Sequence, residues 1–257
     1  MDHRLKDKVA VITGAARGIG EAIARRLAAD GALCVIADLD LPEAEGVAAD
    51  LPGAMALHCD ITKADDVAAL VAAVDARYGR LDILVNNASV LDYSSLDGLD
   101  MANYHRVVNI NMNGAVDVCR QCVPLMKRAG TGGRIVFISS INGLRGQPNN
   151  LPYAVAKGGI VNLGRVLAAE LGPDRITVNT ICPGFIDTRM SFLPGTTQHE
   201  RDTEWFRDVY IKHGRLLLGR FGTPAEVAGA AYFFASEDAG YVTGQVLAVD
   251  GGLMATF

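Results

Sequence analysis

KVAVITGAARGIGEAIARRLAADGALCVIADLD, from Lys8 to Asp40, is the stretch that indicates the fold of this chain. A continuous apolar run is followed by Gly14, Gly18 and Gly20, then by a helical pattern and a second apolar run. This order predicts a strand–turn–helix–strand unit. The first turn of such a helix offers unpaired amide groups and a partial positive charge, and glycine allows a phosphate to approach them. The stretch therefore predicts a phosphate-binding turn.

Asp38 ends the second apolar run, 18 residues beyond Gly20. In dinucleotide-binding units a carboxylate at this place accepts hydrogen bonds from the ribose hydroxyls of adenosine. The glycines and Asp38 together therefore predict a dinucleotide cofactor.

The same alternation of segments continues along the chain. The apolar runs are continuous, as expected for parallel strands covered on both faces, and no linker rich in proline, glycine or serine divides them. We expect one α/β domain over residues 1–257, a doubly wound sheet of about seven parallel strands with helices on both faces. The strands are expected at 8–13, 33–37, 54–58, 81–86, 134–139, 176–181 and 245–249, and the helices at 19–30, 42–51, 63–78, 101–129, 153–171 and 224–236. Residues 188–222 are irregular and polar, and we expect them to form a lid over the site.

The composition of the chain disfavours some classes of binding partner. The chain has 24 basic and 29 acidic residues, a net charge of −5, and no basic block, which disfavours nucleic acid and an anionic membrane surface. It shows neither a signal-peptide pattern nor an apolar run long enough to span a bilayer, so a cytoplasmic location is expected.

Cysteine and histidine patterns indicate no metal or disulfide chemistry. Five cysteines lack the spacing of a disulfide framework. Cys119 and Cys122 lie in an apolar helical pattern and are expected to pack as small hydrophobic groups. The five histidines are scattered, so no metal site is expected.

Four motifs occur in a characteristic order: TGAARGIG at 13–20, NNA at 86–88, YAVAK at 153–157 and PG at 183–184. With these motifs the sequence resembles the classical short-chain dehydrogenases/reductases over nearly its whole length. The resemblance implies a Rossmann-like fold, a nicotinamide cofactor, a homotetramer and a catalytic set of Asn111, Ser140, Tyr153 and Lys157. One departure is Ser89, where the family usually has glycine after NNA; a serine there either crowds the turn or adds a hydrogen bond.

Tyr153 and Lys157 are four residues apart and so share one helix face. A nearby ammonium is expected to lower the pKa of the phenol and make Tyr153 a general acid/base. In the family pattern the catalytic serine precedes the tyrosine by 13 residues, which selects Ser140 and leaves Ser139 structural. The family motif N-x-x-G selects Asn111, which the resemblance places in a proton relay to the lysine.

The cofactor is expected to be NAD, with NADP less favoured. A 2′-phosphate would be repelled by Asp38, and Leu39 stands where NADP-preferring relatives often carry a basic group, whereas Arg17 could pair with that phosphate. The predicted cofactor-binding residues are Gly14, Arg17, Gly18, Ile19, Gly20, Asp38, Asp60, Ile61, Asn87, Tyr153, Lys157, Pro183, Gly184, Ile186 and Thr188.

Two sets of loop residues lead to different small-molecule substrates. The polar residues Asn142, Arg145, Gln147, Asn149 and Asn150 favour a sugar or polyol. The apolar residues Phe185, Phe192, Leu193 and Trp205 favour a cyclic or aromatic secondary alcohol.

Three functions follow from the sequence. The first is an NAD-dependent dehydrogenase of a polyol, sugar or other secondary alcohol. The second is an NADPH-dependent ketone or 3-ketoacyl reductase. The third is a non-catalytic cofactor-binding protein, which would not need all four catalytic residues. We expect the apolar C-terminal segment, 246–257, to lie near a subunit contact.

Overall fold

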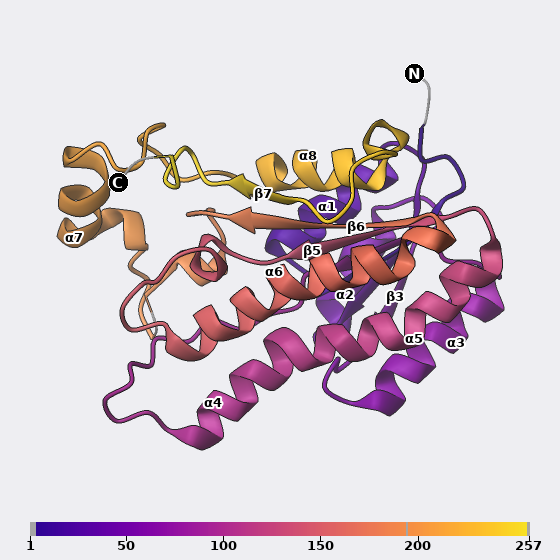
Figure 1. Ribbon diagram of the computed structural model, residues 1–257, viewed down its shortest axis with the longest axis horizontal. Coiled ribbons are helices and arrows are strands. Elements are labelled where there is room, and N and C mark those ends of the chain that lie inside the picture. The colour runs from indigo at the N-terminus through magenta and orange to yellow at the C-terminus, as the bar shows by residue number, and fades with distance from the viewer. Residues whose placement is uncertain (1–3, 194, 256–257) are drawn as a thin grey trace.

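The computed structural model describes residues 4–193 and 195–255, whose strands form one parallel sheet (Figure 1). The order across the sheet is β3-β2-β1-β4-β5-β6-β7. The strands are β1 (Val9–Thr13), β2 (Leu33–Asp38), β3 (Met55–His58), β4 (Ile83–Asn86), β5 (Gly133–Ile138), β6 (Ile176–Pro183) and β7 (Val246–Val249). All seven predicted strands are confirmed.

Helices cover both faces of this sheet. They are α1 (Gly18–Ala28), α2 (Leu41–Ala49), α3 (Ala64–Tyr78), α4 (Met101–Val108), α5 (Gly114–Ala129), α6 (Leu151–Leu171), α7 (Glu204–Phe206) and α8 (Pro224–Ala235). Core residues of α1, α2 and α8 pack together on one face, and those of α3, α5 and α6 pack on the other. In Figure 1, α8 and the α4–α6 layer lie on opposite sides of the strands.

Strand β1 shows why this sequence forms a two-faced sheet. All five of its residues are buried, and successive side chains of a strand point to opposite faces. Val9 and Val11 accordingly join the core beneath α3 and α5, whereas Ala10 and Ile12 join the core beneath α1 and α8. A strand that is apolar at every position is stable only between two layers of helices.

The strand order reverses direction between β1 and β4, and ligands of such sheets bind outside the carboxyl ends of the strands at this point. The glycine turn follows β1, residues 87–91 follow β4, and Ser139 and Ser140 follow β5. The topology therefore brings the separate sequence motifs to one edge of the sheet.

Two segments differ from simple expectation. The predicted helix over 101–129 is interrupted by a π-helical segment, Asn109–Asn113, between α4 and α5. The segment 188–222 contains short helical pieces, Arg189–Ser191, Glu200–Asp202, α7 and Arg207–Lys212, rather than a plain loop. Residue 194 of that segment and residues 256–257 of the C-terminal segment lie outside the described residues. Over the described parts of the chain, no helix combines the length and apolar character needed to cross a bilayer.

Candidate active site

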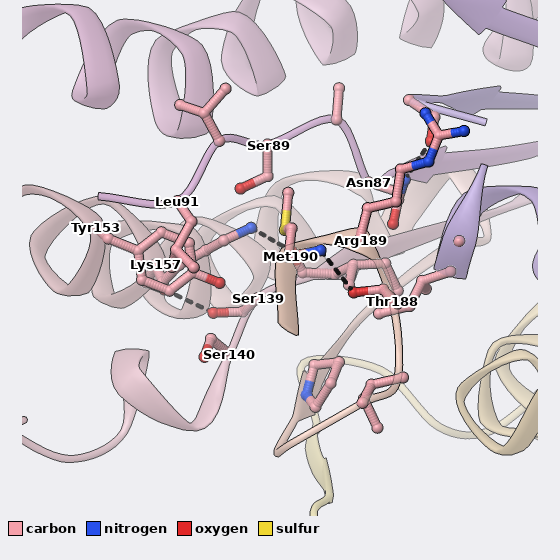
Figure 2. Close-up of a pocket in the computed structure, with 18 of the residues that line it drawn as sticks. Asn87, Ser89, Leu91, Ser139, Ser140, Tyr153, Lys157, Thr188, Arg189 and Met190 are labelled. Atoms are coloured by element: carbon pink, nitrogen blue, oxygen red, sulfur yellow. Dashed lines mark hydrogen bonds between the residues drawn. The ribbon is translucent and has the colours of Figure 1, made fainter. Parts of the chain in front are cut away.

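A cavity of about 620 Å³ opens at the carboxyl ends of β1, β4, β5 and β6. Every predicted cofactor residue except Gly20 lines it, as do Ser140, Tyr153 and Lys157 of the predicted catalytic set. Figure 2 shows Tyr153 and Lys157 close to Ser139 and Ser140, with Asn87, Thr188 and Arg189 farther along the same pocket. Asn111 does not line the cavity.

The three glycines of the turn have different roles. Gly18 has a φ of +60°, and a Cβ there would lie 3.6 Å from the Thr188 methyl carbon across the cavity. Arg17, at the N-cap of α1, provides no side-chain acceptor for the first-turn amides. The beginning of α1 therefore fits a phosphate group, which would accept those hydrogen bonds.

Gly14 and Gly20 are required by the packing of the protein itself. A Cβ on Gly14, whose φ is +63°, would lie 2.7 Å from the Ala88 Cα. A Cβ on Gly20 would lie 2.3 Å from the Gly14 carbonyl oxygen and 2.6 Å from the Asn87 Nδ2. The explanation of all three glycines by phosphate approach is thus wrong for Gly20, which is outside the cavity, and incomplete for Gly14.

Asp38 is held at the end of β2 by backbone amides. Its Oδ2 accepts a hydrogen bond from the Ala16 N–H at 2.9 Å, and its Oδ1 accepts one from the Asp40 N–H at 3.0 Å. The nearby Arg17 pairs with Asp40, and its Nε lies 2.6 Å from the Glu43 Oε2. The positive charge of Arg17 is therefore already balanced by two carboxylates of the protein.

Tyr153 and Lys157 are buried side by side on α6, with exposed fractions of 9% and 3%. The Lys157 Nζ lies 5.6 Å from the centre of the Tyr153 ring and donates a hydrogen bond to the Ile138 carbonyl at 2.9 Å. Burial lowers the pKa of Lys157 to about 8. Both groups are thus removed from water at one end of the cavity.

The predicted lowering of the tyrosine pKa is wrong for this arrangement. Burial raises the pKa of Tyr153 to about 12, and the neighbouring Ser140 hydroxyl opposes this only in part. The physical reason is that desolvation disfavours the phenolate, while the Lys157 amine is directed at the Ile138 carbonyl. Tyr153 is therefore a protonated phenol at neutral pH.

The two serines after β5 have separate partners. The Ser139 hydroxyl donates a hydrogen bond to the Lys157 carbonyl at 2.8 Å, which ties β5 to α6. The Ser140 Oγ accepts a hydrogen bond from the Asn142 N–H at 3.1 Å, and its hydroxyl hydrogen-bonds the Tyr153 side chain, which lowers the pKa of that phenol in part. The distinction that the sequence makes between Ser139 and Ser140 agrees with these contacts.

Asn111, buried in the π-helical segment, holds the chain that follows β4. Its Oδ1 accepts hydrogen bonds from the Val90 N–H at 2.8 Å and from the Ser89 hydroxyl at 3.1 Å. Its Nδ2 donates to the Val90 carbonyl at 2.8 Å. Ser89, the departure from the family motif, thus adds a hydrogen bond to Asn111, and both Ser89 and Val90 line the cavity.

Polar and apolar side chains from the predicted substrate loops also line the cavity. Of the predicted substrate residues, Asn142, Gln147, Asn150 and Phe185 line it. The structure places the other predicted substrate residues outside the lining: Arg145, Asn149, Phe192, Leu193 and Trp205. Further lining residues belong to no motif, and sequence reasoning names none of them individually. Leu91 and Tyr93 follow β4, and Met190, Glu200 and Phe221 lie in the predicted lid, 188–222.

The two cysteines of the C-x-x-C pattern lie outside the cavity lining. Cys119 and Cys122 are buried on α5 and unbridged, and burial raises the pKa of both thiols, as expected for small hydrophobic groups. Within residues 4–193 and 195–255, no cluster of three or more His, Cys, Asp or Glu side chains could hold a metal ion.

Comparison with known proteins places this fold and cavity in one class. A family model described as enoyl-(acyl carrier protein) reductase matches residues 14–254. The chain belongs to the short-chain dehydrogenase/reductase family, whose members are oxidoreductases that bind a nicotinamide cofactor.

Individual relatives differ in their reactions. A 3-oxoacyl-[acyl-carrier-protein] reductase FabG of Thermotoga maritima is 37% identical, over 98% of this chain and 99% of that protein. A galactitol 2-dehydrogenase of Agrobacterium fabrum is 36% identical, over 97% of this chain and 98% of that protein. A crystal structure from Agrobacterium tumefaciens, whose description suggests a gluconate dehydrogenase, aligns with a TM-score of 0.92 and 32% identity over 100% of both chains.

Proposed function

We propose that this protein is an NAD-dependent dehydrogenase that interconverts a secondary alcohol and its ketone, with Tyr153 as the general acid/base. The observation that carries the proposal is that Ser140, Tyr153 and Lys157 line the same cavity as the glycine turn and Asp38. The dehydrogenase name of the galactitol relative supports the direction and the substrate class.

Each side chain has a defined task in this proposal. Bound nicotinamide would supply the hydride acceptor, held by the turn after β1, Asp38, Asn87 and residues 183–188. The Ser140 hydroxyl, which lies beside Tyr153, hydrogen-bonds the substrate oxygen and stabilises charge that develops there. In oxidation Tyr153 would act as the phenolate, its own proton having been passed on through Lys157, and would take the alcohol proton. In reduction the Tyr153 phenol would give its proton to the ketone oxygen.

Lys157 and Asn111 support the proton transfer. With a pKa of about 8, Lys157 exchanges protons near neutral pH, which a tyrosine of pKa about 12 does poorly by itself. Asn111 positions Ser89 and Val90 beside this end of the cavity. Tyr153 thus contacts the substrate, while Lys157 connects it to solvent protons.

The preference for NAD rests on charge. A 2′-phosphate at the end of β2 would face the Asp38 carboxylate, and a like-charge contact at about 4 Å costs about 4 kcal/mol at an effective dielectric constant of 20. Arg17, the residue best placed to offset this repulsion, is held by Asp40 and Glu43. The adenosine end therefore favours a ribose with free hydroxyls.

Steady-state kinetics with both cofactors test this preference. A panel of secondary alcohols, polyols and sugars is scored by the appearance of reduced nicotinamide, first with NAD and then with NADP. We expect NAD to give the higher kcat/KM and Asp38→Asn to reduce that preference at least tenfold. Asp50→Asn, on the exposed C-terminal side of α2, is the matched control and should leave it unchanged. A marked NADP preference of the unaltered protein would contradict the proposal.

An NADPH-dependent 3-ketoacyl reductase is the second candidate. The 3-oxoacyl reductase relatives favour it, as do Arg17 and Arg189, two cationic side chains in the cavity wall. Arg189, however, lies 3.2 Å from the Glu43 Oε1, so its charge is also partly balanced. Rapid NADPH-dependent reduction of acetoacetyl thioesters, with no alcohol oxidation, would select this candidate.

Two further expectations concern assembly and motion. We propose a homotetramer, which size-exclusion chromatography with light scattering would test. We also propose that residues 188–222 close over bound ligand, since Thr188, Met190, Glu200 and Phe221 of this segment line the cavity. Slower hydrogen exchange of the segment in the presence of NADH would support closure.

A further inference from the structure

Glu200 places a carboxylate in the wall of the cavity. It begins the short helical piece Glu200–Asp202 in the segment after β6. The other carboxylates in the lining are Asp38 and Asp60, which follow β2 and β3 at the adenosine end. Glu200 comes from a different part of the chain, the segment after β6.

Tyr93 is a second residue of the cavity wall that is related to both Glu200 and Tyr153. Tyr93 and Glu200 line the same cavity, and burial and then the negative charge of Glu200 raise the pKa of Tyr93. Tyr93 also contributes to the raised pKa of Tyr153, after burial and the Cys182 thiol. Tyr93, Glu200 and Tyr153 all line the cavity, so the Glu200 carboxylate shares one enclosed space with the Tyr153 phenol.

No side chain of the described residues neutralises Glu200. Its carboxylate has no hydrogen bond and no ion pair with them, unlike Asp187 of the same segment, which pairs with Arg201 and His199. Burial raises the pKa of Glu200 above its usual range, which reflects a carboxylate taken partly out of water without a compensating cation.

Two amide side chains in the same wall also lack partners. Asn150 is 3% exposed, and its side-chain oxygen is buried without a hydrogen bond. The side-chain oxygen of Asn142 is in the same state. Buried polar atoms of proteins are nearly always paired, so each of these two oxygens requires a partner from outside the chain, such as a water molecule or a ligand hydroxyl.

We propose that Glu200 selects the substrate: its carboxylate accepts hydrogen bonds from the hydroxyls of a neutral polyhydroxylated alcohol and repels substrates that carry a carboxylate. Asn142 and Asn150 supply further polar contacts to the same hydroxyls. This inference rests on the proposed function, because it needs an alcohol at Tyr153. The loop residues of the sequence are compatible with either a polyol or an apolar alcohol as substrate, and a carboxylate in the cavity wall favours the polyol.

The test compares two ligands that differ at one terminal carbon, which is neutral in one and part of an anionic group in the other. D-glucitol and D-gluconate have the same carbon chain, with a terminal hydroxymethyl group in one and a carboxylate in the other. Dissociation constants of both are measured by calorimetry on the protein saturated with NADH, and kcat/KM is measured for each compound that is turned over. Calorimetry gives a result whether or not these particular compounds are oxidised.

We expect the unaltered protein to bind the hexitol at least tenfold more tightly than the aldonate. Glu200→Gln keeps the shape but removes the charge, and should reduce this ratio at least tenfold while weakening hexitol binding. Glu204→Gln is the matched control, since Glu204 is an exposed carboxylate of the same segment outside the cavity. It should leave the ratio unchanged.

If the protein oxidises another alcohol of the panel, the proposed function stands and two outcomes overturn the inference. The first is an unaltered protein that binds the aldonate as tightly as the hexitol, or that binds neither compound. The second is a Glu200→Gln variant with the same ratio of dissociation constants as the unaltered protein. Failure of the proposed function has a different signature. In that case no alcohol is oxidised with either cofactor although NADH binds.

Discussion

Replacing Lys157 by methionine should stabilise the fold at neutral pH while abolishing activity. Burial lowers the pKa of Lys157 from 10.5 to about 8, so the folded protein holds this proton less tightly than the unfolded chain does. Between pH 8 and 10.5 the unfolded chain binds more protons, and the free energy of unfolding of the unaltered protein therefore rises with pH across this window. Below pH 8 both states are protonated, and the destabilisation is constant.

The size of the effect follows from the pKa and one hydrogen bond. Since one pKa unit corresponds to about 1.4 kcal/mol, the buried ammonium costs about 3 kcal/mol at pH 7 and about 1 kcal/mol at pH 10. Methionine has similar length and no charge, but it loses the hydrogen bond to the Ile138 carbonyl, worth about 1 kcal/mol. We expect Lys157→Met to be about 2 kcal/mol more stable than the unaltered protein at pH 7 and about equally stable at pH 10.

Urea denaturation of both proteins at pH 7 and pH 10 measures this difference. Titration of the remaining groups, including Tyr153, is common to both proteins and cancels. An equal difference at both pH values would refute the reasoning, because it would mean that the Lys157 proton is not linked to folding. A Lys157→Met protein that still turned over substrate would remove Lys157 from the proposed mechanism.

Three other substitutions test separate parts of the site. Tyr153→Phe should lower kcat by about 10²–10⁴-fold while NADH binding, followed by fluorescence titration, stays nearly unchanged; turnover close to that of the unaltered protein would exclude the general acid/base role. Gly20→Ala should lower the free energy of unfolding, measured by urea denaturation, by about 1–3 kcal/mol, because the added Cβ would overlap backbone atoms. Gly46→Ala is the control: Gly46 lies on α2 with open space around it, so this substitution should raise the free energy of unfolding by up to about 1 kcal/mol. Equal effects of the two substitutions would contradict the packing argument. Ser89→Gly removes one hydrogen bond to Asn111 and should cost about 1 kcal/mol, and a double-mutant cycle with Asn111→Ala that shows simple additivity would disprove this contact.

Much of the fold was predictable because its signals are local. Each strand is a short apolar run and each helix a periodic pattern, and the turn after β1 lies within a single stretch of sequence. The parallel sheet follows from the alternation of these segments, since each crossover needs a helix. The family resemblance selects Ser140, Tyr153 and Lys157 through fixed spacings along the chain, and the sheet topology brings them to one cavity.

The tertiary structure alone decided the features that depend on distant residues. Glu200 and Tyr93 are more than a hundred residues apart and meet only because two loops fold over the same edge of the sheet. The pKa of Tyr153 rises rather than falls because the surrounding elements exclude water and direct the Lys157 amine to Ile138. The spacing of a motif determines which groups can become neighbours, but burial and the orientation of each group set its charge, and these depend on the whole chain.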